Sequence, residues 1–418
     1  MSKDSTPNNH VDDDSSSVEA PVGQKDSLRS FIGTLASFSG DLSSLTCPSF
    51  LLSSVSLLEY SQYWGDHPKL FASISAGASP EERLLNCTRW FISTLNGSYS
   101  ARSTAAGMEK KPYNPILGEQ YFATWPGDET TGATVLTAEQ VSHHPPIMGF
   151  HLENKDAGVF LDGHCGQKSR FAMPAGIDVG QTGHAILTLP KFNETYLITL
   201  PTLNIRGIVT GRPTVELAGS TYIISSANQL TTIEYSTKGY FSGERHSFKA
   251  TIKSLASGSS PIYTAQGVWS GVSNYKDHQP SSPSSSSSKK SALEGRLFFD
   301  AQTDKAVIPD VTAIEEQGPL ESRRLWATVT KAINAKDYGT ASREKSQIED
   351  AQRVLAKARK ERGETQADAL KIFVLVDEDA DESGLAFKSL KEKLTNAAGA
   401  KAIKEDDKKP HWRLRLRQ

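Results

Sequence analysis

Two adjacent histidines, His143 and His144, are followed directly by two prolines in the string EQVSHHPP, residues 139–146. The preceding residues, 131–141, are typical of a strand, and the prolines end it because neither has an N–H to give to a sheet. Successive strand side chains point to opposite faces, so we expect the two imidazoles to diverge unless the backbone twists at the prolines. Diverging imidazoles do not suit a small metal ion, and we predict no metal site here. They suit the rim of a larger anionic ligand.

A second pattern with possible chemistry lies some two hundred residues further along. Lys345, Glu349 and Arg353 are spaced i, i+4, i+8 and so share one helix face. Spacing alone favours ordinary salt bridges, worth about 0.2–0.5 kcal/mol each. The alternative is that Lys345 and Arg353 donate to a phosphate while Glu349 bridges and orients them. We expect this helix to pack through Ile348, Ala351 and Leu355.

An enzyme is the less favoured interpretation of the histidine pair. A hydrolase needs a nucleophile oriented by one histidine, and Ser142 is adjacent in sequence, which gives poor geometry. The chain has no Gly-x-Ser-x-Gly, His-Glu-x-x-His, Gly-x-Gly-x-x-Gly or Gly-x-x-x-x-Gly-Lys string. We therefore predict no catalytic residue and no cofactor, and a site that binds phosphate.

Composition limits the partners and the compartment. The chain has 46 Lys and Arg against 48 Asp and Glu, so we expect no nucleic-acid partner and only a local anion site. Its three cysteines are widely spaced, which suits a reducing compartment and not a zinc site. No apolar run reaches the roughly 18 residues needed to span a bilayer, and the Ser- and Asp-rich start is no secretory signal. We expect a cytoplasmic monomer.

The elements that must position these residues begin after a polar tail, residues 1–25, which we predict to be disordered. Leu28, Phe31 and Leu35 belong to an apolar stripe at helical spacing. That short helix could be part of the core, a movable flap or a weak membrane-surface helix. Further helices are predicted at 50–64 and 80–95, followed by a fixed proline-rich loop at 110–119.

The middle of the chain, residues 120–300, is predicted to be β. Short runs of Val, Ile, Thr and Tyr recur at roughly 8–12 residues with no helix between them, which indicates an antiparallel meander that must curl or close to hide its edges. A low-complexity surface loop, 277–291, precedes a last strand at 296–300. Beyond residue 310 we expect helices at 319–334, 342–362 and 385–395, with a short apolar run at 371–376 and a basic tail from His411.

These segments resemble one family. EQVSHHPP is the signature string of the oxysterol-binding-protein-related lipid carriers, and four further segments are similar to theirs: 110–119, 239–243, 267–271 and 319–323. The resemblance extends from about Ser27 to Trp412. It is strongest to the short fungal members that consist of the lipid-binding domain alone.

The resemblance implies an α+β, β-dominated fold: a large, nearly closed antiparallel β-barrel with a lipid tunnel, an N-terminal helical lid and a helical C-terminal region. The expected division is a tail at 1–25 and a single domain at 26–418. Within that domain, 26–50 is the lid, 51–110 is helical, 111–300 is the barrel with a disordered loop at 277–291, and 301–418 is the helical C-terminal region.

The resemblance also implies two groups of site residues. The headgroup of phosphatidylinositol 4-phosphate would be held by Lys111, Asn114, His143, His144, Lys345, Glu349 and Arg353, with the backbone around Leu42 and Leu45 on the glycerol phosphate side. This reverses the salt-bridge interpretation of the 345–353 helix. A sterol tunnel and its lid would include Leu28, Phe31, Leu35, Ser98 and Tyr99. Ser98 and Leu28 depart from the Gln and Trp of sterol-binding relatives.

The implied function is a lipid transfer protein, not an enzyme, that exchanges sterol for phosphatidylinositol 4-phosphate between organelle membranes. It would be cytoplasmic and peripherally associated with Golgi and endoplasmic reticulum through transient membrane contact. One alternative is a carrier of another lipid, such as phosphatidylserine, against the same phosphoinositide. Another is a phosphoinositide sensor that regulates Golgi traffic without net transport. No role is predicted for 366–376 or for the 277–291 loop.

Overall fold

The structure is a computed structural model that describes residues 30–31, 33–34, 37–38, 47–100, 110–172, 176–206, 214–236, 244–256, 258, 260–279, 295–376, 379, 381–404 and 412–415. The predicted tail, most of the predicted lid and residues 280–291 of the predicted loop lie outside these ranges. So do four of the proposed site residues: Leu28, Leu35, Leu42 and Leu45. Of the described residues in the first part of the predicted lid, Ser30, Phe31, Gly33, Thr34 and Ser37 are helical and Phe38 is not.

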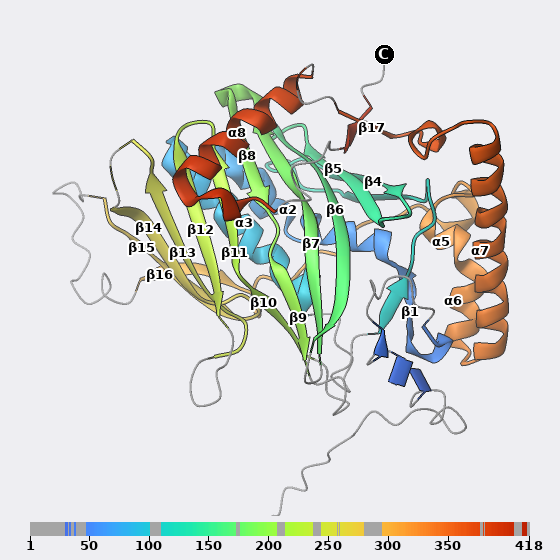
Figure 1. The fold of residues 1–418 in the computed structure, drawn as a ribbon. Coiled ribbons are helices and arrows are strands. Elements are labelled where there is room, and N and C mark those ends of the chain that lie inside the picture. Colours follow the sequence, from blue (N-terminus) through green and yellow to red (C-terminus); the bar gives the residue numbers. More distant parts are fainter. Residues whose placement is uncertain are drawn as a thin grey trace, which may run out of the picture.

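Among the described residues, one sheet of 14 strands dominates the fold (Figure 1). Its path runs from β3 at one edge to β16 at the other, mostly by pairing neighbours in the chain, while β9 and β10 extend it beside β7. The bounds are β3 Gln120–Trp125, β4 Thr134–Ser142, β5 Ile147–Asn154, β6 Val159–Ala172, β7 Gly176–Leu189, β8 Glu194–Thr199, β9 Thr202–Arg206, β10 Thr214–Ala218, β11 Ser220–Ser225, β12 Gln229–Ser236, β13 Ser247–Ser254, β14 Pro261–Val268, β15 Val272–Asp277 and β16 Arg296–Asp300. The predicted β-dominated antiparallel fold is confirmed.

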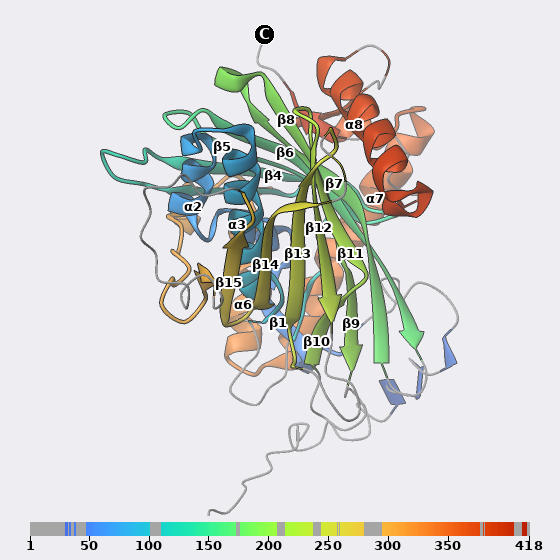
Figure 2. The same cartoon turned by 90° about the vertical axis from the view of Figure 1, so that its left-hand side faces the viewer.

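Alternation along the strands separates an inner from an outer face. On β7, Ala185 and Leu187 join the large central cluster, whereas Ile186 between them joins a second cluster on the other face. Successive strand side chains point to opposite faces, so this split is expected. Helix α8 (Glu382–Ala398) covers the outer face with Phe387, Leu390 and Leu394 (Figure 2).

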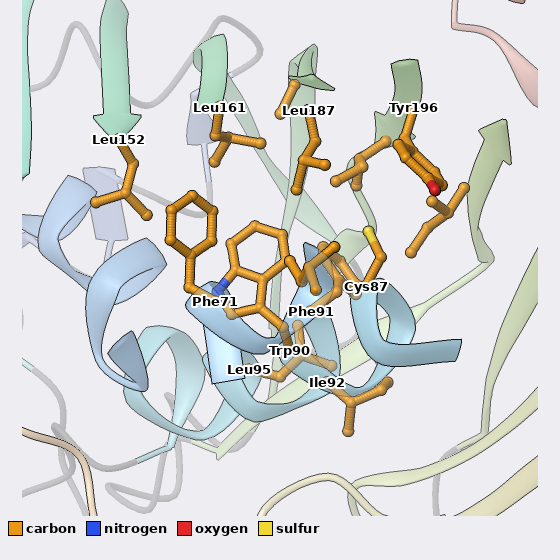
Figure 3. Packing of buried hydrophobic residues seen from close by; sticks show 14 of the residues in the cluster. Phe71, Cys87, Trp90, Phe91, Ile92, Leu95, Leu152, Leu161, Leu187 and Tyr196 are labelled. Carbon is orange, nitrogen blue, oxygen red and sulfur yellow. The ribbon is translucent and has the colours of Figure 1, made fainter. Parts of the chain in front are cut away.

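Helix α3 (Pro80–Tyr99) fills one end of the interior. Ser79 caps it by accepting the N–H of Glu82, and Pro80 suits its first turn. Figure 3 shows Trp90 facing Leu161 and Leu187 of β6 and β7, and Phe91, Leu95 and Leu152 belong to the same cluster. The same cluster extends from Tyr121 on β3 to Phe299 on β16. The two ends of the sheet therefore curl around a common core that includes α3.

A buried ion pair fixes α3 to the sheet. The Arg83 guanidinium donates to both carboxylate oxygens of Glu194 on β8, at 2.8 Å and 2.6 Å, and the two side chains are only 6% and 7% exposed. Tyr196 donates to the same carboxylate at 2.6 Å. Burial by itself would raise the pKa of Glu194, but the hydrogen bonds from Arg83 and Tyr196 hold that pKa below its ordinary value.

The segment 51–110, predicted to be helical, contains a strand. Strand β1 (Leu52–Ser56) pairs in parallel with β2 (Lys111–Tyr113) and lies between two 3₁₀-helices, η2 (Ser49–Leu51) and η3 (Leu57–Gly65). The predicted helix at 50–64 is wrong in its first half because Ser56 is the N-cap of η3. Its hydroxyl accepts the Leu58 N–H, and its own N–H donates to Glu59. The predicted loop at 110–119 likewise begins with β2.

The remaining N-terminal elements are α2 (Pro68–Ser73) and η4 (Ile74–Ala76), and η5 (Pro190–Phe192) separates β7 from β8. The C-terminal elements are η6 (Ile314–Glu316), α5 (Ser322–Leu325), α6 (Ala327–Asn334), α7 (Tyr338–Glu361), η7 (Ala367–Ala369), β17 (Phe373–Leu375), α8, η8 (Ala400–Ala402) and β18 (Trp412–Leu414). No helix in the described part of the chain is long and apolar enough to cross a bilayer.

Two C-terminal predictions need correction. The single helix predicted at 319–334 is broken at Trp326, whose indole N–H donates at 3.0 Å to the buried carboxylate of Glu119. That bond fixes the Trp326 backbone in a non-helical conformation between α5 and α6. The region 301–418 is not purely helical, since β17 and β18 form a two-stranded antiparallel sheet.

The Arg83–Glu194 pair gives a stability prediction. Glu194→Ala leaves a buried guanidinium without its partner and should lower the free energy of unfolding by about 3–5 kcal/mol. Urea unfolding followed by circular dichroism measures the loss. The control is Lys357→Ala, which breaks an exposed pair on α7 and should cost less than about 0.5 kcal/mol. Equal losses in the two variants would contradict a structural role for the buried pair.

Candidate functional site

A pocket of about 510 Å³ lies between α7, the segment that begins with β2 and the turn between β4 and β5. In Figure 1 the elements that contribute its lining, α7 and the end of β4, lie on the same side of the molecule. Seven of the residues predicted for the headgroup line it: Lys111, Asn114, His143, His144, Lys345, Glu349 and Arg353. The other lining residues are Cys47, Leu52, Pro112, Ile116, Leu117, Gln352, Ala356, Arg359, Lys360, Glu364, Thr365 and Gln366. The fold thus brings together three segments that the sequence separates widely.

A buried carboxylate positions the first segment. Glu119, fully buried at the end of the proline-rich loop, accepts four hydrogen bonds. The donors are the hydroxyls of Ser56 at 2.5 Å and Ser322 at 2.7 Å, the Trp326 indole at 3.0 Å and the Ile116 N–H at 3.1 Å. Burial raises the pKa of Glu119, while these donors oppose the shift. Lys111 and Asn114 are therefore presented from a loop fixed to η3, α5 and α6.

The two histidines lie in the turn that joins β4 to β5. Their ring centroids are 4.4 Å apart, so the expected divergence is wrong: β4 ends at Ser142, and strand alternation no longer applies beyond it. Within the preceding strand the Gln140 side-chain amide donates to the Ser142 carbonyl at 2.8 Å, which fixes the start of the turn. Both imidazoles consequently line the same pocket.

His143 is held in one orientation. Its Nδ1 lies 3.2 Å from the Pro115 carbonyl oxygen, which can only accept, so Nδ1 carries the hydrogen. Burial and the neighbouring His144 lower the pKa of His143. In the neutral ring Nε2 is an acceptor, and it becomes a donor only on protonation. An anion that hydrogen-bonds Nε2 would therefore bind together with a proton.

On α7, Lys345, Glu349 and Arg353 all face the pocket. Lys345 forms an ion pair with Glu349, but Arg353 pairs with Asp350 one turn before it. The expectation that Glu349 bridges both cations is therefore wrong. Of the residues expected to pack this helix, Ile348 does so beside Tyr113 and Trp326, whereas Ala351 and Leu355 are exposed. Helix α6 has 8 residues and α7 has 24, so α6 covers only part of α7 and leaves the rest exposed.

The pocket is positive although the chain is nearly neutral. Five lysines and arginines and two glutamates line it, which leaves an excess of three positive charges before any histidine is protonated. Sequence analysis missed Gln352, Arg359, Lys360 and Gln366. Gln352 lies about one turn and Arg359 and Lys360 about three turns beyond Glu349 on the same α7 face, so helical spacing would have found them. Nothing local in the sequence indicated Gln366.

The residues predicted for the tunnel lie elsewhere. Tyr99, at the end of α3, is packed against the central cluster, and the amide of Gln181 on β7 donates to its hydroxyl at 2.9 Å. Ser98 precedes Tyr99 and is partly buried. Phe31 belongs instead to the cluster around Trp326, beside the positive pocket. Ser98 and Tyr99 thus lie at the interior of the sheet, and Phe31 lies on the side of the positive pocket.

No group of three or more His, Cys, Asp or Glu that could hold a metal occurs among the described residues. Cys47 lines the pocket, but burial raises the pKa of its thiol to about 11. At neutral pH that cysteine is a small apolar group, not a thiolate ligand or nucleophile.

The family model of the oxysterol-binding protein matches residues 30–394. The chain belongs to the oxysterol-binding protein family. It is 47% identical over 370 residues to the protein KES1 of Mycosarcoma maydis, which covers 88% of this chain and 92% of that protein. It is 49% identical over 340 residues to the protein kes1 of Schizosaccharomyces pombe, which covers 81% and 85%.

Solved structures from this oxysterol-binding family have the same fold. The crystal structure of the Osh1 ORD domain in complex with cholesterol matches with a TM-score of 0.67 at 20% identity, covering 92% of this chain and 86% of that one. The Osh3 ORD of Saccharomyces cerevisiae, in complex with PI(4)P, matches with a TM-score of 0.62 at 20% identity, covering 85% and 87%.

The role of Glu119 as the anchor of the proline-rich loop is testable. Glu119→Ala leaves two hydroxyls, an indole and a backbone N–H without their acceptor and should lower the free energy of unfolding by about 3 kcal/mol or more. Urea unfolding at neutral pH measures it. Glu364→Ala is the matched control, because that glutamate lines the same pocket but is exposed. A loss as small as that of the control would contradict the anchor.

Proposed function

We propose that this protein is a non-enzymatic lipid transfer protein that binds phosphatidylinositol 4-phosphate and exchanges it for a sterol between organelle membranes. The observation that carries the proposal is the convergence of Lys111, Asn114, the two histidines and three residues of α7 on one positive pocket. These are the residues that the resemblance to the family assigns to the headgroup.

The chemistry of the pocket fits that headgroup. A phosphomonoester carries a charge of about −1.5 to −2 near neutral pH, and the phosphodiester of the same lipid adds about −1. The excess of three positive charges on the lining matches this total. Lysine and arginine form charge-assisted hydrogen bonds with phosphate, and Asn114 can serve the uncharged inositol hydroxyls.

Support for a sterol comes from the relatives and from the interior. The Osh1 domain of similar fold has been solved with cholesterol and with ergosterol. On the inner face of the sheet, the central cluster includes the apolar side chains of Val179, Leu203 and Leu217. The hydrogen-bonded pair of Tyr99 and Gln181 adds one polar position at this interior. A sterol is an apolar body with one hydroxyl, and such a surface with one polar pair suits it.

The sterol and the phosphoinositide compete for one binding space in this proposal. The protein then exchanges them, because binding of one lipid releases the other. We place the protein in the cytoplasm as a monomer that contacts Golgi and endoplasmic reticulum membranes transiently, since lipids of this kind must be drawn from a membrane surface. Phosphatidylserine in place of sterol, or sensing without transport, would use the same headgroup pocket.

A transfer assay between two vesicle populations tests the proposal. Donor vesicles contain phosphatidylinositol 4-phosphate and acceptor vesicles contain sterol or phosphatidylserine, each reported by a fluorescent sensor. We expect phosphoinositide and sterol to move in opposite directions. Movement of phosphatidylserine alone would support the other carrier, and extraction without delivery would support the sensor. A purified protein that extracts no phosphoinositide would overturn the proposal.

The histidine turn provides a site-specific test. Replacing both His143 and His144 by Ala removes two donors to the phosphate, each worth about 1.5–3 kcal/mol, and should weaken phosphoinositide extraction at least about 100-fold. Sterol extraction by the same variant is the control and should be nearly unchanged, because the histidines lie outside the central cluster. Equal loss of both activities would contradict the headgroup assignment.

Binding should also depend on pH. The lowered pKa of His143 means that its imidazole is neutral at pH 7 in the free protein, whereas a bound phosphate favours the protonated ring. Binding then takes up a proton, so affinity should rise as the pH falls from about 8 to about 6.5, above the second pKa of phosphate near 6. Vesicle extraction measured across this range checks it. His143→Gln cannot titrate and should flatten the profile, and an unchanged slope would contradict the proton linkage.

A further inference from the structure

Glu139, the first residue of the EQVSHHPP string, binds a distant segment. It is fully buried on β4, and its carboxylate accepts three consecutive backbone N–H groups, from Lys371 and Ile372 at 3.0 Å and from Phe373 at 2.9 Å. A carboxylate with three N–H donors is a strong, geometrically specific contact. It fixes the segment 364–376, which we call the strap, against the strand that carries the histidine turn.

The strap is also held from its other side. Strand β17, within the strap, pairs with β18, and the Arg415 N–H donates to the Ile372 carbonyl at 2.7 Å. Phe373 is fully buried in a cluster with Leu117, Val141 and Trp412. The strap therefore joins the C-terminal strand to β4, and it does so with buried side chains and paired backbone.

The N-terminal end of the strap, which follows α7, reaches the histidines. Glu364, Thr365 and Gln366 line the positive pocket. The backbone N–H of His143 donates to the side-chain oxygen of Gln366 at 2.9 Å. This N–H lies just beyond the last residue of β4, and the two prolines that follow His144 have no N–H at all. The turn thus depends on a donor–acceptor contact supplied by the strap.

We infer that Gln366 is a positioning residue for the histidine turn and that the strap, held by Glu139 and β18, is a structural wall of the headgroup pocket. The inference rests on the proposed function for what the pocket binds, and on geometry alone for the positioning. Gln366 need not touch the phosphate to affect its binding. It acts by keeping the His143 backbone, and with it the imidazole, in the orientation set by Pro115.

Hydrogen exchange tests the positioning without any lipid. In Gln366→Leu the His143 N–H loses its acceptor, so deuterium uptake by the peptide 141–148 should increase. The signal is clean because the two prolines contribute no amide hydrogen. Gln347→Leu, an exposed glutamine on α7 outside the pocket lining, is the matched control and should leave that peptide unchanged. Identical uptake in Gln366→Leu and wild type would overturn the inference.

Binding to vesicles with phosphatidylinositol 4-phosphate provides the second readout. Gln366→Leu should weaken extraction by about two- to ten-fold, the worth of one hydrogen bond, with sterol extraction and thermal midpoint unchanged. In a His143→Ala background it should cost nothing more, because the imidazole it positions is gone. An additive loss would mean that Gln366 contacts the ligand directly, and would refute positioning.

Glu139→Gln tests the anchor of the strap. Its amide retains one acceptor oxygen and turns a donor toward the strap, so the amides of residues 371–373 should exchange faster and phosphoinositide extraction should fall while sterol extraction persists. Unchanged exchange would refute the anchor. If wild-type protein bound no phosphoinositide, the proposed function would fail, and the exchange data would still decide whether Gln366 and Glu139 order the turn.

Discussion

Two buried carboxylates, Glu119 and Glu139, hold in place the segments that line the positive pocket. They are close in the fold, because Glu139 on β4 pairs with Gln120 on β3, the residue after Glu119. Each would be costly to bury alone, and each is satisfied by donors from distant parts of the chain. Glu119 takes its donors from the η3 cap, α5 and the α5–α6 junction, and Glu139 takes its donors from the strap. The helical region and the C-terminal strand are therefore tied to the same edge of the sheet.

This arrangement explains how a nearly neutral chain can have a locally positive pocket. The cations of α7 come from a helix that α6 and the cluster around Trp326 hold in place, while the histidines come from a turn at the end of a long strand. Neither element contributes to the central cluster around α3. The residues of the central cluster and the residues that line the positive pocket are thus separate, which leaves the pocket free to vary without loss of the fold.

The sequence predicted those features that depend on local pattern. Strand β16 has the predicted bounds, α3 begins at the predicted Pro80, and a shared motif identified residues that the fold brings to one pocket. Features that depend on distant partners could not be predicted. Apolar spacing made β1 look helical, since its partner β2 lies some sixty residues away. The break at Trp326 depends on Glu119, and the pairing of Arg353 with Asp350 depends on rotamers that spacing does not determine.

The same limit applies to the segment 366–376, for which the sequence suggested no role. Its apolar run is short and its polar residues form no motif, so a single chain offers no local signal that it belongs to the site. Its role comes from hydrogen bonds of backbone N–H groups: three of its own donate to the Glu139 carboxylate, and the side-chain oxygen of Gln366 accepts the N–H of His143. Backbone donors are the same for every residue type except proline, so sequence can vary along such a strap while its contacts persist. The turn from His143 to Pro146 contains two prolines, so few backbone N–H groups are left to hold it in place. The N–H of His143 is one of them, and its acceptor, Gln366, is therefore part of the structure that positions the histidines.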